Sequence, residues 1–454
     1  MTIQKPPRAS FLGLDFASAP ADFTKKAIAK HGHVWEVVVG GIIGPRVFGI
    51  AGAEALKAFY NPENICRYPA ANQHVLNYFW TSRGFPGLPP LDGPNHLVRK
   101  RNFLTLTTYE STEKLLQVTD EPMEEAIKAI GKDNQAFSFF DFSNRMVFGL
   151  FSKQWFGLGI DDWEGGARAE ALTKAIQEIF AVVGDKDPEV EAKVEAKSLL
   201  TSYMEAVLAA VRARPADYQK SRLAAYLKTE ETQMLNDDEL IMDMFQVLAS
   251  GTYGLVTHGT CSADALLEYP EVRAKVAAEV RDFHGPITIK NLLALKYTTA
   301  FVKEVLRWYP VVHSLVGYSL RDFTVEGMLV PANEKVMACL WGTLHDPTVF
   351  ENPKRFDPER HMPPRNNGQQ ESWNDWSVVF GGGDGHNGHA CAGKMVVLAH
   401  LVHMTTRLVQ NWDFHKEDPD EKVVWPRCES HAENGLMLRR GAAPSSKPRR
   451  GMYF

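Results

Sequence analysis

The stretch FGGGDGHNGHACAG, residues 380–393, decides the fold because it sets one cysteine in a glycine-rich loop directly ahead of an apolar helix. The next residues, KMVVLAHLVHM (394–404), repeat apolar side chains at helical spacing, which places Cys391 just before a helix N-terminus. Free backbone N–H groups and the helix dipole favour a thiolate there. Glycines on both sides, Gly393 among them, let the backbone approach a large flat ligand without Cβ clashes. A thiolate facing such a ligand suggests haem, because the sulfur donates electron density to the iron.

Two other interpretations stay open on the loop alone. A lone cysteine is more often a small buried hydrophobic residue than a ligand. The histidines around it could also complete a zinc site with its sulfur; they are His386, His389, His400 and His403. The spacing of these residues matches no regular Cys/His pairing, which counts against zinc.

Two upstream motifs add information. The segment FVKEVLRWYP (301–310) places Glu304 and Arg307 three residues apart on one helix face, where an ion pair can form. The segment FDPER (356–360) adds Arg360 in a stretch that its proline keeps from being helical. A single pair of this kind is usually a surface pair of little energetic value. The order of these two motifs and the cysteine loop is therefore more informative than any one of the three alone.

In this order, the E-x-x-R pair, the P-E-R segment and the cysteine loop resemble those of the cytochrome P450 haem-thiolate family. The resemblance extends over nearly the whole chain. It implies the cytochrome P450 fold, mainly α with small β-sheets, as one domain over residues 1–454. It implies haem b as cofactor, with Cys391 as the axial thiolate ligand of the iron. It also implies that Glu304, Arg307 and Arg360 form a buried triad that supports the cysteine loop.

The cysteine loop departs from the common family pattern. It is lengthened by three glycines, and Asp384 stands where most members have phenylalanine. This version resembles the bacterial fatty-acid peroxygenase branch, which consumes hydrogen peroxide directly. Three other segments resemble counterparts in that branch; they are residues 51–60, 91–100 and 342–347.

The same resemblance implies haem-propionate contacts from four basic residues, which are His96, Arg99, Lys100 and His389. Cations at those positions would offset two buried carboxylates. The alternative for each is a solvent-facing charge, because such groups are seldom buried unpaired.

Residues 237–268 predict a long helix, opened by acidic residues and followed by Pro270. Oxygen-activating relatives carry an acid followed by an alcohol in this helix, whereas this chain has Ala249, Ser250, Gly251 and Thr252. Without the acid, the usual proton relay to dioxygen is missing, unless Thr252 acts through ordered water.

Fatty-acid peroxygenases carry Arg-Pro at the turn that aligns with Ala249 and Ser250. The arginine holds the substrate carboxylate, so this chain is expected to lack that anchor. The glycines at 251 and 254 predict either a local opening of the helix, a closely approaching ligand, or tight helix packing.

Composition limits the class of protein. The chain has 454 residues, 44% of them apolar, and a formal charge of −5, which gives no basic footprint for nucleic acid. Its N-terminus is polar and proline-broken and no apolar run reaches membrane-spanning length, so we expect a cytoplasmic protein that does not bind membranes. Its five cysteines show no paired framework, which predicts reduced thiols.

The coarse secondary structure begins with a small β region. Residues 34–40 and 46–50 are β-branched runs that predict a short hairpin. Residues 69–93 are rich in proline, glycine and aromatics; they are typical of the roof of a haem pocket or, equally, of satellite packing under a loop. Residues 137–156 predict an aromatic-rich core helix.

These features predict a haem-thiolate enzyme that oxidises a small organic molecule, with hydrogen peroxide as the leading oxidant. One alternative is a dioxygen-dependent monooxygenase served by a ferredoxin and its reductase. Another is oxidative coupling of aromatic rings or a catalytic rearrangement, as in natural-product biosynthesis. A haem-binding sensor or carrier is the alternative from outside the enzymes; tight ligand binding without turnover would favour it.

Overall fold

The structure is a computed structural model. The residues that it describes are 4–9, 20–38, 46–67, 81–82, 85–88, 91–133, 135–157, 171–172, 174–175, 190–365, 376–421, 423–424, 431–432 and 435–441.

Helices dominate the described chain. The α-helices are α2 (Pro20–His31), α3 (Ala53–Phe59), α5 (Gly93–Leu106), α6 (Tyr109–Ala129), α7 (Phe139–Phe156), α9 (Val190–Ala213), α10 (Arg222–Tyr226), α11 (Asp237–Glu268), α12 (Pro270–Val280), α13 (Ile289–Ala294), α14 (Lys296–Trp308), α15 (Leu340–Leu344) and α16 (Lys394–Gln410). Short 3₁₀ helices are η4 (Thr232–Met234), η5 (Pro358–His361) and η6 (Trp376–Phe380). Among the helices described, none is both long enough and apolar enough to cross a membrane.

The strands form small sheets. The largest has the order β1-β2-β10-β7-β3, from β1 (Val34–Val38), β2 (Arg46–Ile50), β10 (Lys335–Cys339), β7 (Ser314–Ser319) and β3 (Ile65–Cys66). The smaller sheets are formed by β4 (Thr81–Ser82) with β5 (Phe85–Pro86), β8 (Phe323–Val325) with β9 (Met328–Val330), β12 (Val423–Val424) with β13 (His431–Ala432), and β11 (Phe414–Lys416), β14 (Met437–Arg440) and β6 (Phe137–Ser138). The mainly helical fold with small sheets is the predicted one.

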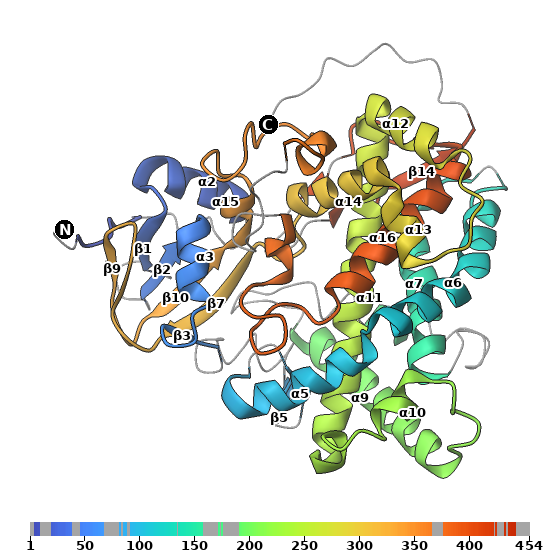
Figure 1. The fold of residues 1–454 in the computed structure, drawn as a ribbon, viewed down its shortest axis with the longest axis horizontal. Coiled ribbons are helices and arrows are strands. Elements are labelled where there is room, and N and C mark those ends of the chain that lie inside the picture. Colours follow the sequence, from blue (N-terminus) through green and yellow to red (C-terminus); the bar gives the residue numbers. More distant parts are fainter. Residues whose placement is uncertain are drawn as a thin grey trace.

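The predicted hairpin is confirmed. β1 and β2 pair antiparallel, with Val34 opposite Ile50 and Val38 opposite Arg46. The parallel pairing of β2 with β10 brings two segments that lie far apart in the sequence into one sheet. This sheet and α3 lie on one side of the molecule, while most long helices lie on the other (Figure 1).

The helix α11 runs through the middle of the helical side of the molecule, where it packs against α7, α9 and α16 (Figure 1). It begins with a capping box: the Asn236 side chain accepts the Glu239 N–H at 3.0 Å, and the Glu239 carboxylate accepts the Asn236 N–H at 3.0 Å. It ends before Pro270, which starts α12. The predicted long helix is therefore present, and it runs without a break through residues 251–254, so the predicted local opening is wrong.

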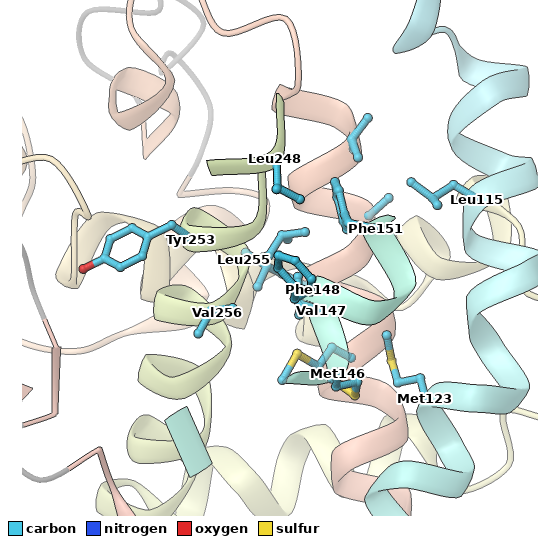
Figure 2. Packing of buried hydrophobic residues seen from close by; sticks show 14 of the residues in the cluster. Leu115, Met123, Met146, Val147, Phe148, Phe151, Leu248, Tyr253, Leu255 and Val256 are labelled. Carbon is cyan, nitrogen blue, oxygen red and sulfur yellow. The ribbon is translucent and has the colours of Figure 1, made fainter. Parts of the chain in front are cut away.

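A large apolar core joins α6, α7, α11 and α16. Phe148 and Phe151 of α7 lie against Leu255 of α11 in its centre (Figure 2). The aromatic stretch 137–156 thus belongs to the core as predicted, but it is not one helix. Residues 137–138 form β6, and α7 starts afterwards because the Ser138 hydroxyl accepts the N–H of Asp141 at 3.0 Å.

The stretch 69–93, predicted to roof a haem pocket, lies mostly outside the described residues. Its described part includes β4, β5 and the N–H of Leu88, which donates to the Gln246 side chain of α11 at 2.7 Å. This segment therefore contacts α11 directly.

Candidate haem-thiolate site

Cys391 lies immediately ahead of α16, whose N-cap is Gly393. The N–H of Cys391 donates to the carbonyl oxygen of Phe380 at 2.6 Å, which closes the glycine-rich loop at its base. Its side chain is accessible. Even so, burial raises the pKa of the Cys391 thiol, while the Gly393 N–H and the charges of Lys100 and Lys394 oppose that rise. The thiol therefore keeps an accessible surface although protein atoms surround it closely enough to disfavour its charged form.

Asp384 shapes the lengthened part of the loop. Its carboxylate accepts two N–H groups of the following turn, at 2.9 and 2.6 Å, and its carbonyl accepts the N–H of Gly388 at 2.8 Å. Gly381 has φ +79°, and a Cβ there would lie 2.6 Å from the carbonyl oxygen of His389. A Cβ on Gly388 would lie 2.7 Å from the Asp384 nitrogen. This loop path therefore requires glycine at both positions.

Lys100 of α5 contacts the cysteine loop through its side chain. Its ammonium donates to the carbonyl oxygens of Gly388 and Ala390, just before Cys391. The side chain is 1% exposed. The contact joins α5 to the cysteine loop, which lie beside each other in Figure 1. Lys100 was predicted from its resemblance to contact a propionate; in the described structure its partners are loop carbonyls.

A cluster of basic groups lies at the start of α5. The His96 and His389 rings are 4.3 Å apart between centroids, and His389 Nε2 lies 3.2 Å from Asp92 Oδ1. The other Asp92 oxygen accepts the backbone N–H of Arg67 at 2.6 Å. The Nη2 atom of Arg67 is buried and has no hydrogen-bond partner among the described residues. Sequence reasoning missed Arg67, which lies in no motif, and assigned no role to Asp92, although Asp92 lies in the segment 91–100 that resembles the peroxygenase branch.

Arg99 is directed elsewhere. Its guanidinium pairs with Asp243 of α11, and the Tyr226 hydroxyl donates to the same carboxylate at 2.5 Å. All three side chains are buried. Burial raises the pKa of Asp243, and the Arg99 charge opposes that rise. The structure therefore places Arg99 in the contact between α5 and α11, rather than beside Lys100 at the cysteine loop.

The structure brings Glu304, Arg307 and Arg360 together in the interior. Glu304 accepts Arg307 Nε at 2.9 Å, Arg307 Nη2 at 2.8 Å and Arg360 Nε at 3.2 Å. Glu304 and Arg307 have no exposed surface, and Arg360 is 3% exposed. The remaining guanidinium N–H groups donate to carbonyls between residues 344 and 355, which ties α14 and η5 to that segment.

His361 is a fourth member that sequence reasoning missed. Its Nε2 lies 2.9 Å from Glu304 Oε2, and the ring is buried. Although burial alone would raise it, the Arg307 charge and the hydrogen bonds of Arg307 and His361 hold the pKa of Glu304 well below its usual range. The only signal in the sequence is that His361 directly follows Arg360.

Five residues in the middle of α11 are accessible, whereas their neighbours in the helix are buried; we call these five residues the stripe. It consists of Gln246, Val247, Ser250, Gly251 and Gly254. Residues 246, 250 and 254 follow one another at four-residue spacing, which places them on one helix face. A Cβ on Gly254 would meet no atom within 4 Å, whereas one on Gly251 would lie 3.3 Å from the Phe151 ring. Gly254 therefore borders open space, and Gly251 serves helix packing.

Ala249 and Ser250, which align with Arg-Pro of the fatty-acid peroxygenases, differ in their exposure. Ser250 lies on it and is exposed, while Ala249 is 2% exposed and belongs to the apolar core. Thr252 is buried as well, and its hydroxyl donates to the carbonyl of Leu248 at 2.6 Å. The stripe carries no charged side chain.

The comparisons with known proteins begin with a family model. The model described as Cytochrome P450 matches residues 5–429. The chain belongs to the cytochrome P450 family. The predicted single domain over 1–454 stays a prediction.

Curated relatives of this P450 are distant. Cytochrome P450 monooxygenase CLM2 of Gibberella zeae is 29% identical over 177 residues, which are 38% of this chain and 32% of the relative. Cytochrome P450 26B1 of Danio rerio is 23% identical over 414 residues, 86% of this chain and 76% of the relative. The chain spans about a third of the length of the first curated relatives that it matches.

Solved structures share the fold over almost the full length. Wild-type cytochrome P450EX alpha with myristic acid superposes with a TM-score of 0.78 at 22% identity, covering 96% of this chain and 98% of that one. A variant of cytochrome P450 OleT in complex with arachidonic acid gives 0.80 at 18% identity, covering 97% and 100%. The likeness shows the P450 fold.

Membership in the family implies haem with an axial cysteine thiolate, and the described residues fit that group. Cys391 offers an accessible sulfur, and its loop glycines allow close approach to a flat ligand. Arg67 offers a buried N–H donor suited to a carboxylate. Cys339, by contrast, is fully buried, and burial raises the pKa of its thiol to about 11 although Ser314 and Thr24 donate to the sulfur.

The zinc interpretation is wrong for the described residues. His403 Nε2 pairs with Asp120 at 2.7 Å, and His400 Nδ1 pairs with the carbonyl of Val396 at 2.9 Å. Within the described part of the chain, no three potential ligand side chains gather as a metal site. Both histidines belong to the α16 packing.

Proposed function

We propose that this P450 uses hydrogen peroxide to oxidise an uncharged, largely apolar organic molecule, with Cys391 as the axial ligand of its haem. The haem, when bound, supplies the redox chemistry. The accessible stripe of α11 carries this proposal, because its side chains offer neither an acid for proton delivery to dioxygen nor a cation for a carboxylate. The Thr252 hydroxyl, which was the candidate replacement for the acid, donates to its own helix.

One further observation supports the peroxide route. The lengthened loop of residues 380–393 resembles the peroxygenase branch. Arg99 of α5, one candidate for a carboxylate anchor, is paired with Asp243. An uncharged substrate would avoid leaving a carboxylate buried without a partner. Ser250 and the Gln246 amide are the polar groups of the stripe that could orient it.

A matched pair of ligands tests the substrate class. Purified ferric holoprotein would be titrated with myristic acid and with its methyl ester, and the spin-state change of the haem would report binding. We expect the ester to bind at least as tightly as the acid. A site with a cationic anchor should instead prefer the acid by about tenfold or more, since a hydrogen bond to a charged group contributes about 1.5–3 kcal/mol; that result would overturn the proposed substrate class.

The oxidant is tested by turnover of the ligand that binds best. One reaction receives hydrogen peroxide alone, and the other receives a ferredoxin, its reductase and dioxygen. We expect product in the reaction with hydrogen peroxide and none above background in the reaction with ferredoxin, its reductase and dioxygen. Product only in the ferredoxin reaction would identify a monooxygenase, and tight binding with no product in either reaction would identify a sensor or carrier.

A further inference from the structure

The side-chain amide of Gln246 lies between a buried backbone group and the stripe. The N–H of Leu88 donates to Gln246 Oε1 at 2.7 Å. Leu88 is 8% exposed, and its carbonyl accepts the N–H of Leu91 at 3.2 Å, so both polar groups of its backbone are paired. Leu88 follows β5 in the chain, and both β4 and β5 pack against α11. Gln246 therefore satisfies a buried donor of the segment that covers this part of α11.

This hydrogen bond determines the orientation of the Gln246 amide. A backbone N–H can only donate, so the amide turns its oxygen toward Leu88 and its NH₂ group away from it. Gln246 keeps an accessible surface. Among the described residues, none accepts a hydrogen bond from the NH₂ group. The amide therefore presents N–H donors to a molecule that lies beside the stripe.

Ser250 adds a second donor on the same face of α11. It follows Gln246 by four residues, a spacing at which the Cβ atoms of a helix are about 5–6 Å apart. Ser250 is exposed, and its hydroxyl can donate. The other residues of the stripe, Val247, Gly251 and Gly254, have no polar side-chain group. A carbonyl oxygen has two lone pairs and can accept from both donors, while the hydrocarbon part of the same molecule packs on the rest of the stripe.

We propose that Gln246 and Ser250 form a subsite for a carbonyl oxygen, so that the substrates of this P450 are apolar ketones and esters. The proposal rests on the proposed function, because it places the substrate beside the stripe, and it adds the polar group by which that uncharged substrate is recognised. Gln246 is the specificity-determining residue. Because Leu88 already holds its amide, less conformational entropy is lost when the substrate binds.

A matched pair of ligands separates substrate recognition from a purely structural role of Gln246. Acetophenone and ethylbenzene share one skeleton and differ only in a carbonyl that replaces a methylene group. Gln246→Glu, ionised at mildly alkaline pH, keeps an oxygen for the Leu88 N–H but has no N–H donor. Gln233→Glu is the matched control, since it makes the same change at an exposed residue of η4. Each ferric holoprotein is titrated with both ligands, and the spin-state change of the haem gives the dissociation constants.

We expect Gln246→Glu to weaken acetophenone binding roughly tenfold relative to ethylbenzene, because the carbonyl loses a donor and meets a negative oxygen instead. Ser250→Ala should weaken acetophenone roughly threefold and leave ethylbenzene unchanged. Gln233→Glu should match the parent with both ligands. An equal loss for both ligands in Gln246→Glu would show that Gln246 only holds the segment of Leu88, and the proposal would be wrong.

Two further outcomes keep the test decisive. If Gln246→Glu does not fold, Ser250→Ala decides, since Ser250 is exposed; an unchanged ratio of the two dissociation constants would then overturn the subsite. The proposed function fails by a different result, which is a preference of the parent for myristic acid over its methyl ester. An unchanged ratio in both variants would overturn the carbonyl subsite and leave the uncharged substrate class standing.

Discussion

The cysteine loop and the accessible stripe of α11 are built in opposite ways. The loop is fixed by contacts along its length: the Asp384 turn, the bond from Cys391 to Phe380, and the Lys100 ammonium. The stripe has one described side-chain bond to another segment, from Leu88 to Gln246. A site needs its iron ligand held tightly, whereas a few replaceable side chains suffice on the substrate side. The many contacts of the loop suit the proposed iron ligand, and the accessible side chains of the stripe suit the proposed substrate side.

The largest effect should come from removing the ligand. We expect Cys391→Ala to abolish the red-shifted Soret band of the ferrous carbon monoxide complex, because the alanine has no sulfur to bind iron. Cys66→Ala is the control: Cys66 lies on β3, where its thiol contacts the Tyr318 carbonyl at 3.6 Å. An unchanged band in Cys391→Ala would contradict the ligand assignment and the comparison above.

The next largest effect should come from the buried cluster of Glu304, Arg307, Arg360 and His361. Glu304→Gln leaves two buried guanidinium groups without their anion, which should cost about 3–5 kcal/mol of unfolding free energy and most of the bound haem. Denaturant unfolding and haem content measure this. Glu63→Gln breaks an exposed pair with Arg321 at 2.8 Å and should cost no more than about 1 kcal/mol. Equal losses in both variants would show that the buried set is not special.

The same carboxylate predicts a pH dependence. The pKa of Glu304 is depressed in the folded protein, so its contribution to stability is fully present above the ordinary carboxyl pKa and is lost as pH falls below that value. We expect the stability difference between the parent and Glu304→Gln to shrink on acidification. A difference that stays constant from neutral pH down to strongly acidic pH would contradict the assignment.

The sequence predicted that Glu304, Arg307 and Arg360 are buried together. It did not predict which residues of α11 are accessible and which are buried. The motifs specify Glu304, Arg307 and Arg360 because their types and order are specific to one arrangement. The accessible face of α11 depends on which neighbours pack against each position, and that information lies in tertiary structure. Arg99 and Lys100 show the same limit: adjacent cations look alike in sequence, yet one pairs with Asp243 and the other with loop carbonyls.

An intermediate effect should follow from placing a cation on α11. Ser250→Arg puts the guanidinium on the accessible stripe, and we expect tighter myristic acid binding by about tenfold with little change for the methyl ester. Ala249→Arg, one position away, forces a charge into the apolar core and should yield little folded protein. Spin-state titration and thermal unfolding measure the two outcomes. A stable Ala249→Arg that gains acid binding would mean that Ala249, not Ser250, faces the substrate.

The smallest effect should distinguish the two glycines of α11. Gly254→Ala adds a methyl group where no atom lies within 4 Å, so it should raise stability by about 0.4–1 kcal/mol through the lower entropy of the unfolded chain. Gly251→Ala gains the same entropy but places its methyl 3.3 Å from the Phe151 ring, so the gain should be cancelled. Thermal unfolding compares them. Because the new methyl of Gly254→Ala points into the space beside the stripe, that variant should also weaken binding of bulky ligands in the spin-state titration, whereas Gly251→Ala should not. Equal behaviour of the two variants in both measurements would mean that the stripe does not border the substrate space.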